Sequence, residues 1–232
     1  MNIPEPEIID PASVPSLKWG IIGPGGIAEV FVSACQKHTA QSFHAVASRT
    51  PGRADEFAKK FQIPKVHDSY ETLVADDEID AIYISSWQSE HYEHAMLALN
   101  AGKHVLVEKP ITVLPEHAKE IFALAREKGL LAMEAMWTRY LPQSTIIRKL
   151  LASGELGKPQ LFAANFSVDN RHIERLWQKG GGSIIYDMGI YPIAMSQQFL
   201  GNPTSLTATG KLHQNGLDEE SHSVLHYESG AR

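Results

Sequence analysis

The sequence predicts an α/β fold, in which a doubly wound parallel sheet precedes an incomplete α+β region with an open, mainly antiparallel sheet. Between Leu17 and about Glu134, short apolar runs alternate with longer amphipathic stretches, which is the pattern of repeated strand–helix–strand units. After Trp137 this alternation stops, and segments follow that are rich in aromatic residues or alternate between polar and apolar residues. Such segments are typical of antiparallel strands.

The parallel sheet is predicted from apolar runs without polar alternation, as expected of strands buried on both faces. These runs are LKWGIIG (17–23), FHAVAS (43–48), AIYISS (81–86), HVLVE (104–108) and LLAME (130–134). Between them, a helical pattern follows Ala28 to about Lys37, and further predicted helices include 68–75, 89–101 and 114–128. Gly102 and Gly129 follow the last two of these, where helix C-caps favour glycine.

The second region contains predicted helices and strands in a different order. We expect helices over 141–152 and 184–200, and strands over 160–170, 205–212 and 221–228. The final segment YESGAR (227–232) predicts the end of a strand, a tight turn and the first residues of a partner strand. We therefore expect the chain to be a C-terminally shortened version of a longer protein.

Composition excludes several classes of function. Lys and Arg number 21 against 27 Asp and Glu, a formal net charge of −6, which does not indicate a nucleic-acid-binding surface. No apolar run approaches the ~18 residues of a membrane span, and the N-terminus lacks the features of a secretion signal. Cys35 is the single cysteine, so an internal disulfide and a cysteine zinc site are excluded, and a cytoplasmic location is expected.

A glycine-rich loop follows the first predicted strand and begins a predicted helix. It consists of Gly23, Pro24, Gly25, Gly26, Ile27 and Ala28, in the pattern GxGxxA. Gly23 permits a tight turn, Gly25 lets a pyrophosphate approach the backbone, and the small Ala28 permits close helix–strand packing. The helix N-terminus supplies free N–H groups for phosphates. This pattern predicts a dinucleotide site, the alternative being a glycine-rich turn in another α/β fold.

The end of the second predicted strand indicates which dinucleotide binds. NAD sites usually carry Asp or Glu there to bind the ribose 2′-hydroxyl. This sequence has Ser48, Arg49 and Thr50, with Arg53 nearby and no carboxylate before Asp55. A guanidinium and two hydroxyls suit a 2′-phosphate, so we predict NADP(H) rather than NAD(H). The alternative is that Arg49 is a solvated loop residue.

Three further residues are candidates for catalysis. Lys109, after Glu108, lies at the end of the predicted strand 104–108, where ligands bind in doubly wound sheets. Asp187 and Tyr191 are four residues apart in a predicted helix and so share one face. Each of these features has an ordinary alternative, a surface lysine and a packed tyrosine.

Taken together, the motifs resemble a known family. The order of GPGGIA, AGKHVLVEKP, EAMWTRYLP and GGGSIIYDMGIYPI is similar to the glucose–fructose oxidoreductase / inositol dehydrogenase / MocA (Gfo/Idh/MocA) family, from Leu17 to Gly201. Many members end the DxGxH element with histidine. This chain has Tyr191 there, like the branch with dimeric dihydrodiol dehydrogenase and NADP-linked D-xylose dehydrogenase.

The resemblance implies a Rossmann domain, NADP dependence and a substrate domain whose open sheet forms a homodimer. It also implies that Lys109 and Tyr191 are catalytic, that Asp187 orients the substrate, and that Trp137 and Arg139 lie near the nicotinamide. Hydride transfer from a secondary alcohol needs a base for the hydroxyl proton. A free tyrosine is a poor base at neutral pH, and a nearby ammonium favours its phenolate. We therefore assign Tyr191 as the acid/base and Lys109 as its electrostatic partner.

The remaining candidates depend on weaker patterns. Ser85 and Ser86 end the strand 81–86 and His91 begins the next helix, so all three are expected to contact the cofactor. His91 and His94 have helical spacing, but no third ligand accompanies them, and we predict no metal site. Arg171 and Trp177 face the substrate or contribute to ordinary packing.

The sequence thus predicts a flexible tail (1–15), an NADP-binding Rossmann domain (16–138) and a substrate and dimerisation domain (139–232), shortened at its end. The predicted function is NADP(H)-dependent oxidation or reduction of a sugar or dihydrodiol-type secondary alcohol. Because of the expected shortening, a non-catalytic NADP(H)-binding or sensing protein is the alternative.

Overall fold

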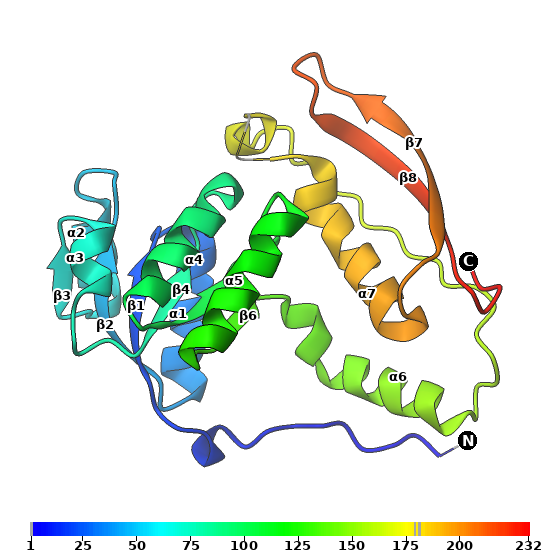
Figure 1. Ribbon diagram of the computed structural model, residues 1–232, viewed down its shortest axis with the longest axis horizontal. Coiled ribbons are helices and arrows are strands. Elements are labelled where there is room, and N and C mark those ends of the chain that lie inside the picture. The colour runs from blue at the N-terminus through cyan, green and yellow to red at the C-terminus, as the bar shows by residue number, and fades with distance from the viewer. Residues whose placement is uncertain (1, 179, 181) are drawn as a thin grey trace. The chain divides into compact units, whose positions relative to one another are not determined.

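The computed structural model describes residues 2–178, 180 and 182–232 and divides into two compact units (Figure 1). The nucleotide unit is Ile9–Ala135. The C-terminal unit is Met136–Arg232 together with the N-terminal stretch that ends at Ile8. That stretch is hydrogen-bonded within its unit, since the Glu7 N–H donates to Thr145 Oγ1 at 2.9 Å.

The nucleotide unit contains a six-stranded sheet in the order β3-β2-β1-β4-β5-β6, and every pair is parallel. The strands are β1 (Lys18–Ile22), β2 (Ser42–Ala47), β3 (Lys65–His67), β4 (Ala81–Ile84), β5 (His104–Val107) and β6 (Ala132–Glu134). This is the Rossmann order, in which the direction of strand progression reverses between β1 and β4. The carboxyl ends of those two strands therefore mark the ligand crevice.

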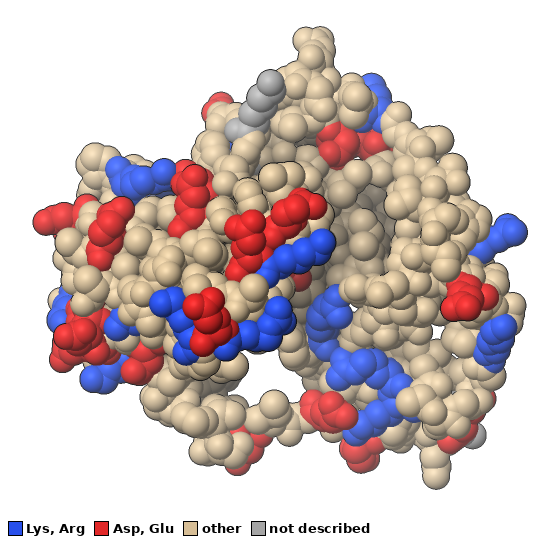
Figure 2. Space-filling view, in the orientation of Figure 1, with Lys and Arg blue, Asp and Glu red and all other residues tan. Residues whose placement is uncertain are grey.

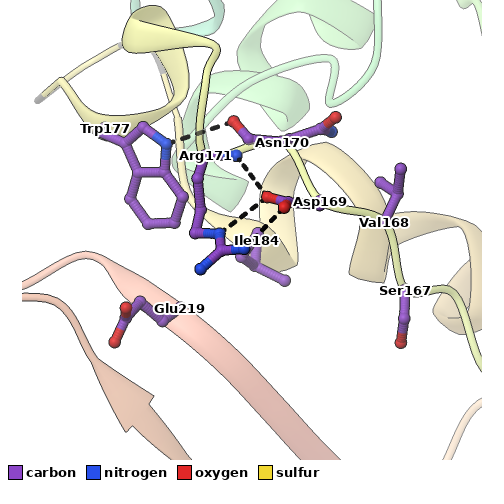
Figure 3. A pocket seen from close by; sticks show the side chains of 8 residues that line it. All are labelled: Ser167, Val168, Asp169, Asn170, Arg171, Trp177, Ile184 and Glu219. Carbon is purple, nitrogen blue, oxygen red and sulfur yellow. Dashed lines mark hydrogen bonds and ion pairs between the residues drawn. The ribbon is translucent and has the colours of Figure 1, made fainter.

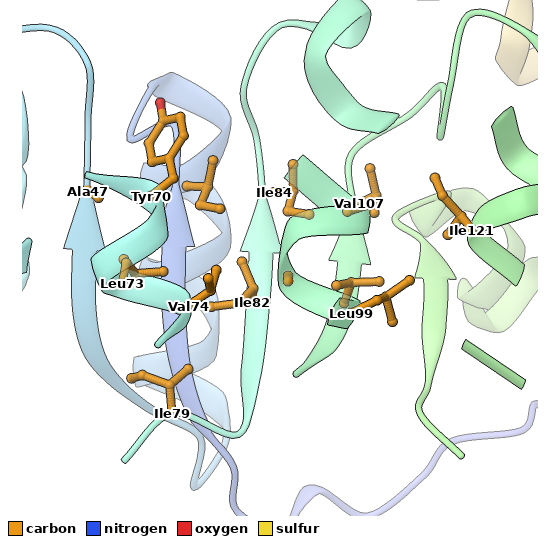
Figure 4. Packing of buried hydrophobic residues seen from close by; sticks show 14 of the residues in the cluster. Ala47, Tyr70, Leu73, Val74, Ile79, Ile82, Ile84, Leu99, Val107 and Ile121 are labelled. Carbon is orange, nitrogen blue, oxygen red and sulfur yellow. The ribbon is translucent and has the colours of Figure 1, made fainter. Parts of the chain in front are cut away.

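Helices cover both faces of this sheet. They are α1 (Gly26–His38), α2 (Arg53–Phe61), α3 (Tyr70–Val74), α4 (His91–Asn100) and α5 (Pro115–Lys128), with short 3-10 turns η1 (Pro11–Ser13) and η2 (Gln88–Glu90). Successive strand residues point to opposite faces, so Ile21 packs with α1 and α2, and Ile22 packs with α3, α4 and α5. Figure 4 shows the second of these clusters, in which Ile82 and Ile84 of β4 lie beside helical side chains.

The predicted fold class is confirmed, and all five predicted strands of the parallel sheet are present within two residues of their expected bounds. The strand that the prediction misses is β3. It has three residues, only one of them apolar, and it lies at the edge of the sheet. A short strand at the edge of a sheet is only partly buried and does not require an apolar run, so its composition does not distinguish it from a loop.

The C-terminal unit is α+β, as expected. Its elements are η3 (Trp137–Tyr140), α6 (Pro142–Ser153), η4 (Glu174–Trp177), a π-helical turn (Ile185–Gly189), α7 (Ile190–Leu200), β7 (Ser205–Leu212) and β8 (Asp218–His226). Both predicted helices are present, and β7 and β8 pair antiparallel. The tight turn near the end is also present, since the Gly230 N–H donates to Tyr227 O at 2.9 Å.

The predicted strand over 160–170 is wrong. This segment is not a strand in the structure, and it is largely exposed. Its backbone is paired at its start, where Arg232 N–H donates to Gln160 O and Phe162 N–H donates to Arg232 O. A strand exists only through a partner strand, and the aromatic content that suggested one cannot supply it.

Charged side chains of both signs lie intermixed on the nucleotide unit in the view of Figure 2. Within the described residues, no helix is long and apolar enough to cross a bilayer.

Candidate functional site

The glycine loop leaves β1 in a turn that only glycine can make. Gly23 has φ +82°, and a Cβ there would lie 2.6 Å from the backbone nitrogen of Ser86. Ser85 Oγ donates to Gly23 O at 2.9 Å, so the loop is bonded to the end of β4. The predicted residues Gly23, Ser85 and Ser86 therefore lie together at the crevice.

The next part of the loop is open where a phosphate would approach. Gly25 caps α1 in an extended conformation, and a Cβ on Gly26 would meet no atom within 4 Å. Ala28 is fully buried beneath the helix start, whereas Ile27 is exposed. Open backbone at a helix N-terminus fits the pyrophosphate of a dinucleotide.

The end of β2 holds the residues predicted to bind a 2′-phosphate. Ser48 Oγ accepts from the Thr50 N–H at 3.1 Å, which shapes this turn, and Arg53 begins α2 with an exposed side chain. The Arg49 guanidinium forms an ion pair with Glu90, Nη2 to Oε1 2.5 Å, and this hydrogen bond raises the pKa of Arg49. Glu90 is separated from Arg49 by 41 residues, and no sequence signal connects the two.

The end of β5 carries Glu108 and Lys109. The Tyr83 hydroxyl donates to Glu108 Oε1 at 2.5 Å, and Glu108 Oε2 accepts from the Lys109 N–H at 3.2 Å. Burial raises the pKa of Glu108, and burial beside this carboxylate raises the pKa of the Tyr83 phenol. The buried Tyr83 thus fixes the Glu108 carboxylate, which in turn accepts a hydrogen bond from the backbone of Lys109.

Two more side chains anchor the turn after Lys109. The buried His91 ring has Nδ1 2.8 Å from Pro110 O and Nε2 3.1 Å from Ser86 O. Glu134 Oε1 accepts from the Ile111 N–H at 2.8 Å. Burial lowers the pKa of His91, and a neutral imidazole has one N–H for these two carbonyl oxygens. His91 thus contacts backbone at both ring nitrogens, joining the β4 and β5 ends of the crevice.

His94, considered with His91 as a metal ligand, is also engaged within the protein. Its Nδ1 lies 2.8 Å from Ser86 Oγ, and its ring meets Tyr70 edge-on with centroids 4.7 Å apart. In the part of the chain that the structure describes, no group of three or more His, Cys, Asp and Glu residues is placed to hold a metal ion.

Tyr191 lies in the C-terminal unit within a group of aromatic side chains. Trp137 Nε1 donates to Tyr191 Oη at 3.3 Å, with ring centroids 5.9 Å apart. Phe166 packs against Tyr191 at a centroid distance of 5.5 Å, and sequence reasoning missed it because it belongs to the segment mistaken for a strand. Arg139 Nη2 donates to Gln197 Oε1 at 2.8 Å, which ties η3 to α7.

The helix that carries Asp187 and Tyr191 is irregular between them. Asp187 lies in the π-helical turn Ile185–Gly189, where the Ile190 N–H donates five residues back to Ile185 O. Pro192, one residue after Tyr191, has no N–H to donate. Isolated π-helical turns are frequent at functional sites. The glycines that precede this turn include Gly181, which lies outside the described residues.

A cavity of about 390 Å³ lies in the same unit, between the segment 167–171 and β8 (Figure 3). Arg171 on its wall is held by Asp169, with Nε to Oδ1 at 2.8 Å and Nη2 to Oδ2 at 2.7 Å, and this pairing lowers the pKa of Asp169. Trp177 Nε1 donates to Asn170 O at 3.4 Å. Arg171 and Trp177 thus line a cavity, with these polar groups bonded to neighbours.

Two family models match nearly the whole chain. One describes an oxidoreductase family with an NAD-binding Rossmann fold and matches residues 17–136; the other, the C-terminal domain of the same family, matches residues 145–232. The chain belongs to the Gfo/Idh/MocA oxidoreductase family. Its glycine loop, Lys109 and Tyr191 all lie within the matched ranges.

Curated members of the Gfo/Idh/MocA family are similar over most of the chain. Trans-1,2-dihydrobenzene-1,2-diol dehydrogenase from Mus musculus is 36% identical over 221 residues, which is 93% of this chain and 66% of the relative. The Homo sapiens enzyme of the same name is 36% identical over 217 residues, 91% of this chain and 65% of the relative. The chain therefore spans slightly less than two thirds of their length.

Solved structures of the family share the fold. A 3-ketoreductase from Actinomadura kijaniata, solved with NADP and TDP-benzene, is 31% identical with a TM-score of 0.83, covering 94% of this chain and 68% of its own. An oxidoreductase from Agrobacterium radiobacter, solved with NAD+, L-tartaric acid and magnesium, is 21% identical with a TM-score of 0.79, covering 94% and 65%. Both neighbours hold a nicotinamide cofactor, but only the NADP of the 3-ketoreductase carries a 2′-phosphate.

Proposed function

We propose that this protein is an NADP(H)-dependent oxidoreductase that transfers a hydride to or from a sugar or dihydrodiol-type secondary alcohol. The observation that carries the proposal is the anchored turn at Lys109. Glu108, His91 and Glu134 each form a hydrogen bond with the backbone between Lys109 and Ile111. This turn and the open glycine loop both lie at the carboxyl ends of the parallel strands. Three anchors on one short turn indicate that the position of the lysine matters.

The nicotinamide dinucleotide, when bound, accepts or supplies the hydride. The backbone of Gly23, Gly25, Gly26, Ile27 and Ala28 would hold its pyrophosphate. The residues proposed to bind the rest of the cofactor are Ser48, Arg49, Thr50, Arg53, Ser85, Ser86, Glu108, Lys109, Trp137 and Arg139. His91, predicted for the same role, is buried with both ring nitrogens on backbone oxygens, so its proposed role is to position the crevice. Arg49 offers the 2′-phosphate a planar set of N–H donors, which favours NADP(H).

Tyr191 is the proposed acid/base, removing or returning the hydroxyl proton of the substrate. The indole N–H of Trp137 donates to its hydroxyl oxygen, and such a bond stabilises a phenolate. Lys109 contributes a positive charge that favours the same phenolate, and Asp187 orients the substrate. The diol chemistry of the 36%-identical relatives supports a vicinal alcohol as the substrate class.

Replacing Tyr191 by Phe tests this assignment. The variant keeps the ring contacts with Trp137 and Phe166 but has no proton to exchange, so turnover should fall by about 10²-fold or more, as for loss of a general base. The dissociation constant for NADPH should stay within twofold. Unchanged turnover would refute the role of Tyr191. NADPH binding by the unmodified chain without turnover on any sugar or diol would support the binding or sensing protein instead.

A further inference from the structure

We propose that Glu90 limits the preference of the nucleotide site for NADP(H) over NAD(H) by competing with the 2′-phosphate for Arg49, an inference that rests on the proposed NADP(H) function. The Glu90 carboxylate forms an ion pair with the Arg49 guanidinium, with Nη2 to Oε1 at 2.5 Å. The Arg49 side chain is 63% exposed and that of Glu90 is 22% exposed. The arginine is thus accessible to a ligand, while its partner is held in the protein.

The position of Glu90 is fixed by the fold. It ends η2, which is separated from the end of β4 by three residues, and its N–H donates to Trp87 O at 2.8 Å. Arg49 is the second residue after the end of β2, and β2 and β4 flank β1 in the sheet. The ion pair therefore joins the two neighbours of β1, the strand that ends in Gly23. Any dinucleotide bound at the glycine loop extends its adenosine ribose toward the end of β2, where this pair lies.

The second carboxylate oxygen of Glu90 is unsatisfied within the part of the protein that the structure describes. Glu90 Oε2 is buried and has no hydrogen-bond partner among the described residues. A buried acceptor without a donor is unfavourable, and a turn of the Glu90 side chain that exposes Oε2 would let a ribose 2′-hydroxyl donate to it. NAD sites use an acidic residue for this hydroxyl, and the end of β2 has none. Glu90, in the segment after β4, brings a carboxylate to Arg49 at the end of β2.

The Arg49–Glu90 ion pair is expected to affect the binding of NAD(H) and NADP(H) in opposite ways. A 2′-hydroxyl can donate to Glu90 and leave the ion pair intact. A 2′-phosphate must take Arg49 from Glu90 and then lies near a second negative charge, which weakens its binding. Arg49 keeps a second support when the pair is broken, because its guanidinium lies 5.9 Å from the centre of the Tyr70 ring.

Glu90→Gln tests the inference, because it removes the charge and retains the shape of the side chain. We expect NADPH affinity, measured by fluorescence titration, to rise about 3- to 10-fold, while NADH affinity stays the same or falls. Glu93→Gln is the matched control, since Glu93 is exposed in the first turn of α4, the helix that begins directly after Glu90. It should change both affinities by less than twofold. Equal unfolding midpoints will establish that both variants are folded.

Arg49→Gln separates this inference from the proposed function. Loss of the guanidinium should weaken NADPH binding about tenfold or more. When Glu90→Gln is added to the Arg49→Gln protein, NADPH affinity should rise by less than twofold. If Arg49→Gln weakens NADPH but Glu90→Gln acts no differently from Glu93→Gln, the role of Glu90 is refuted and the NADP(H) proposal stands. If Arg49→Gln leaves NADPH binding unchanged, the 2′-phosphate site and the inference built on it both fail.

Discussion

Substituting Gly23 by alanine should destabilise the nucleotide unit through two separable effects. The first is backbone strain, because φ +82° costs an L-residue roughly 1–2 kcal/mol. The second is a clash, because the new Cβ would lie 2.6 Å from Ser86 N and 2.8 Å from Ser86 Cα, so backbone must move. Overpacking of this kind costs roughly 1–3 kcal/mol. Together they predict a loss of about 2–5 kcal/mol in the free energy of unfolding.

Two other glycines in the same unit isolate these effects. Gly52 has φ +74° but open space around its Cβ position, so Gly52→Ala should show the strain alone, about 1–2 kcal/mol. Gly26 is helical with open space, so Gly26→Ala should be neutral or stabilise by up to about 1 kcal/mol. Urea unfolding of the three variants provides the measurement. A Gly23→Ala protein no less stable than Gly52→Ala would refute the packing of the loop against β4.

Two further predictions concern pH and assembly. Burial lowers the pKa values of His91 and His94 in the folded protein. Below the pKa of about 6.5 that they have in the unfolded chain, the unfolded state therefore takes up protons that the folded state does not. The free energy of unfolding should therefore decline as pH falls below about 6.5, and His94→Gln should flatten that decline; an unaltered slope would contradict it. Leu206 and Leu212 are 63% and 67% exposed on β7, and we propose that this sheet forms a homodimer. Light scattering should give twice 25.6 kDa, and Leu206→Glu should give the single-chain mass; a single-chain mass for the unmodified protein would exclude the dimer.

Local sequence was informative wherever burial dictates composition. The strands β1, β2, β4 and β5 have a neighbouring strand on each side and most of their positions are apolar, so their runs are visible in the sequence. The strand β6 lies at an edge and was found through the apolar run that begins at Leu130. Gly23 of the glycine loop was equally visible, because its positive φ and its close approach to Ser86 exclude a side chain. Such requirements act on each residue separately.

Pairings between distant segments were not visible. The segment 160–170 has strand-like composition, but it forms no strand in the structure, and its start is paired with Arg232. Phe166 was overlooked beside Tyr191 for the same reason, since its role comes from a contact across 25 residues.

By itself, the sequence determined the α/β class, the dinucleotide loop and the separate candidates Lys109 and Tyr191, because each depends on local patterns of apolar residues, glycine or charge. The tertiary structure alone decided the strand order, the three anchors of the Lys109 turn and the pairing of Arg49 with Glu90. Those features depend on which strands become neighbours in the sheet. The physical reason is that a hydrogen bond or an ion pair between remote residues leaves no periodic trace in either segment.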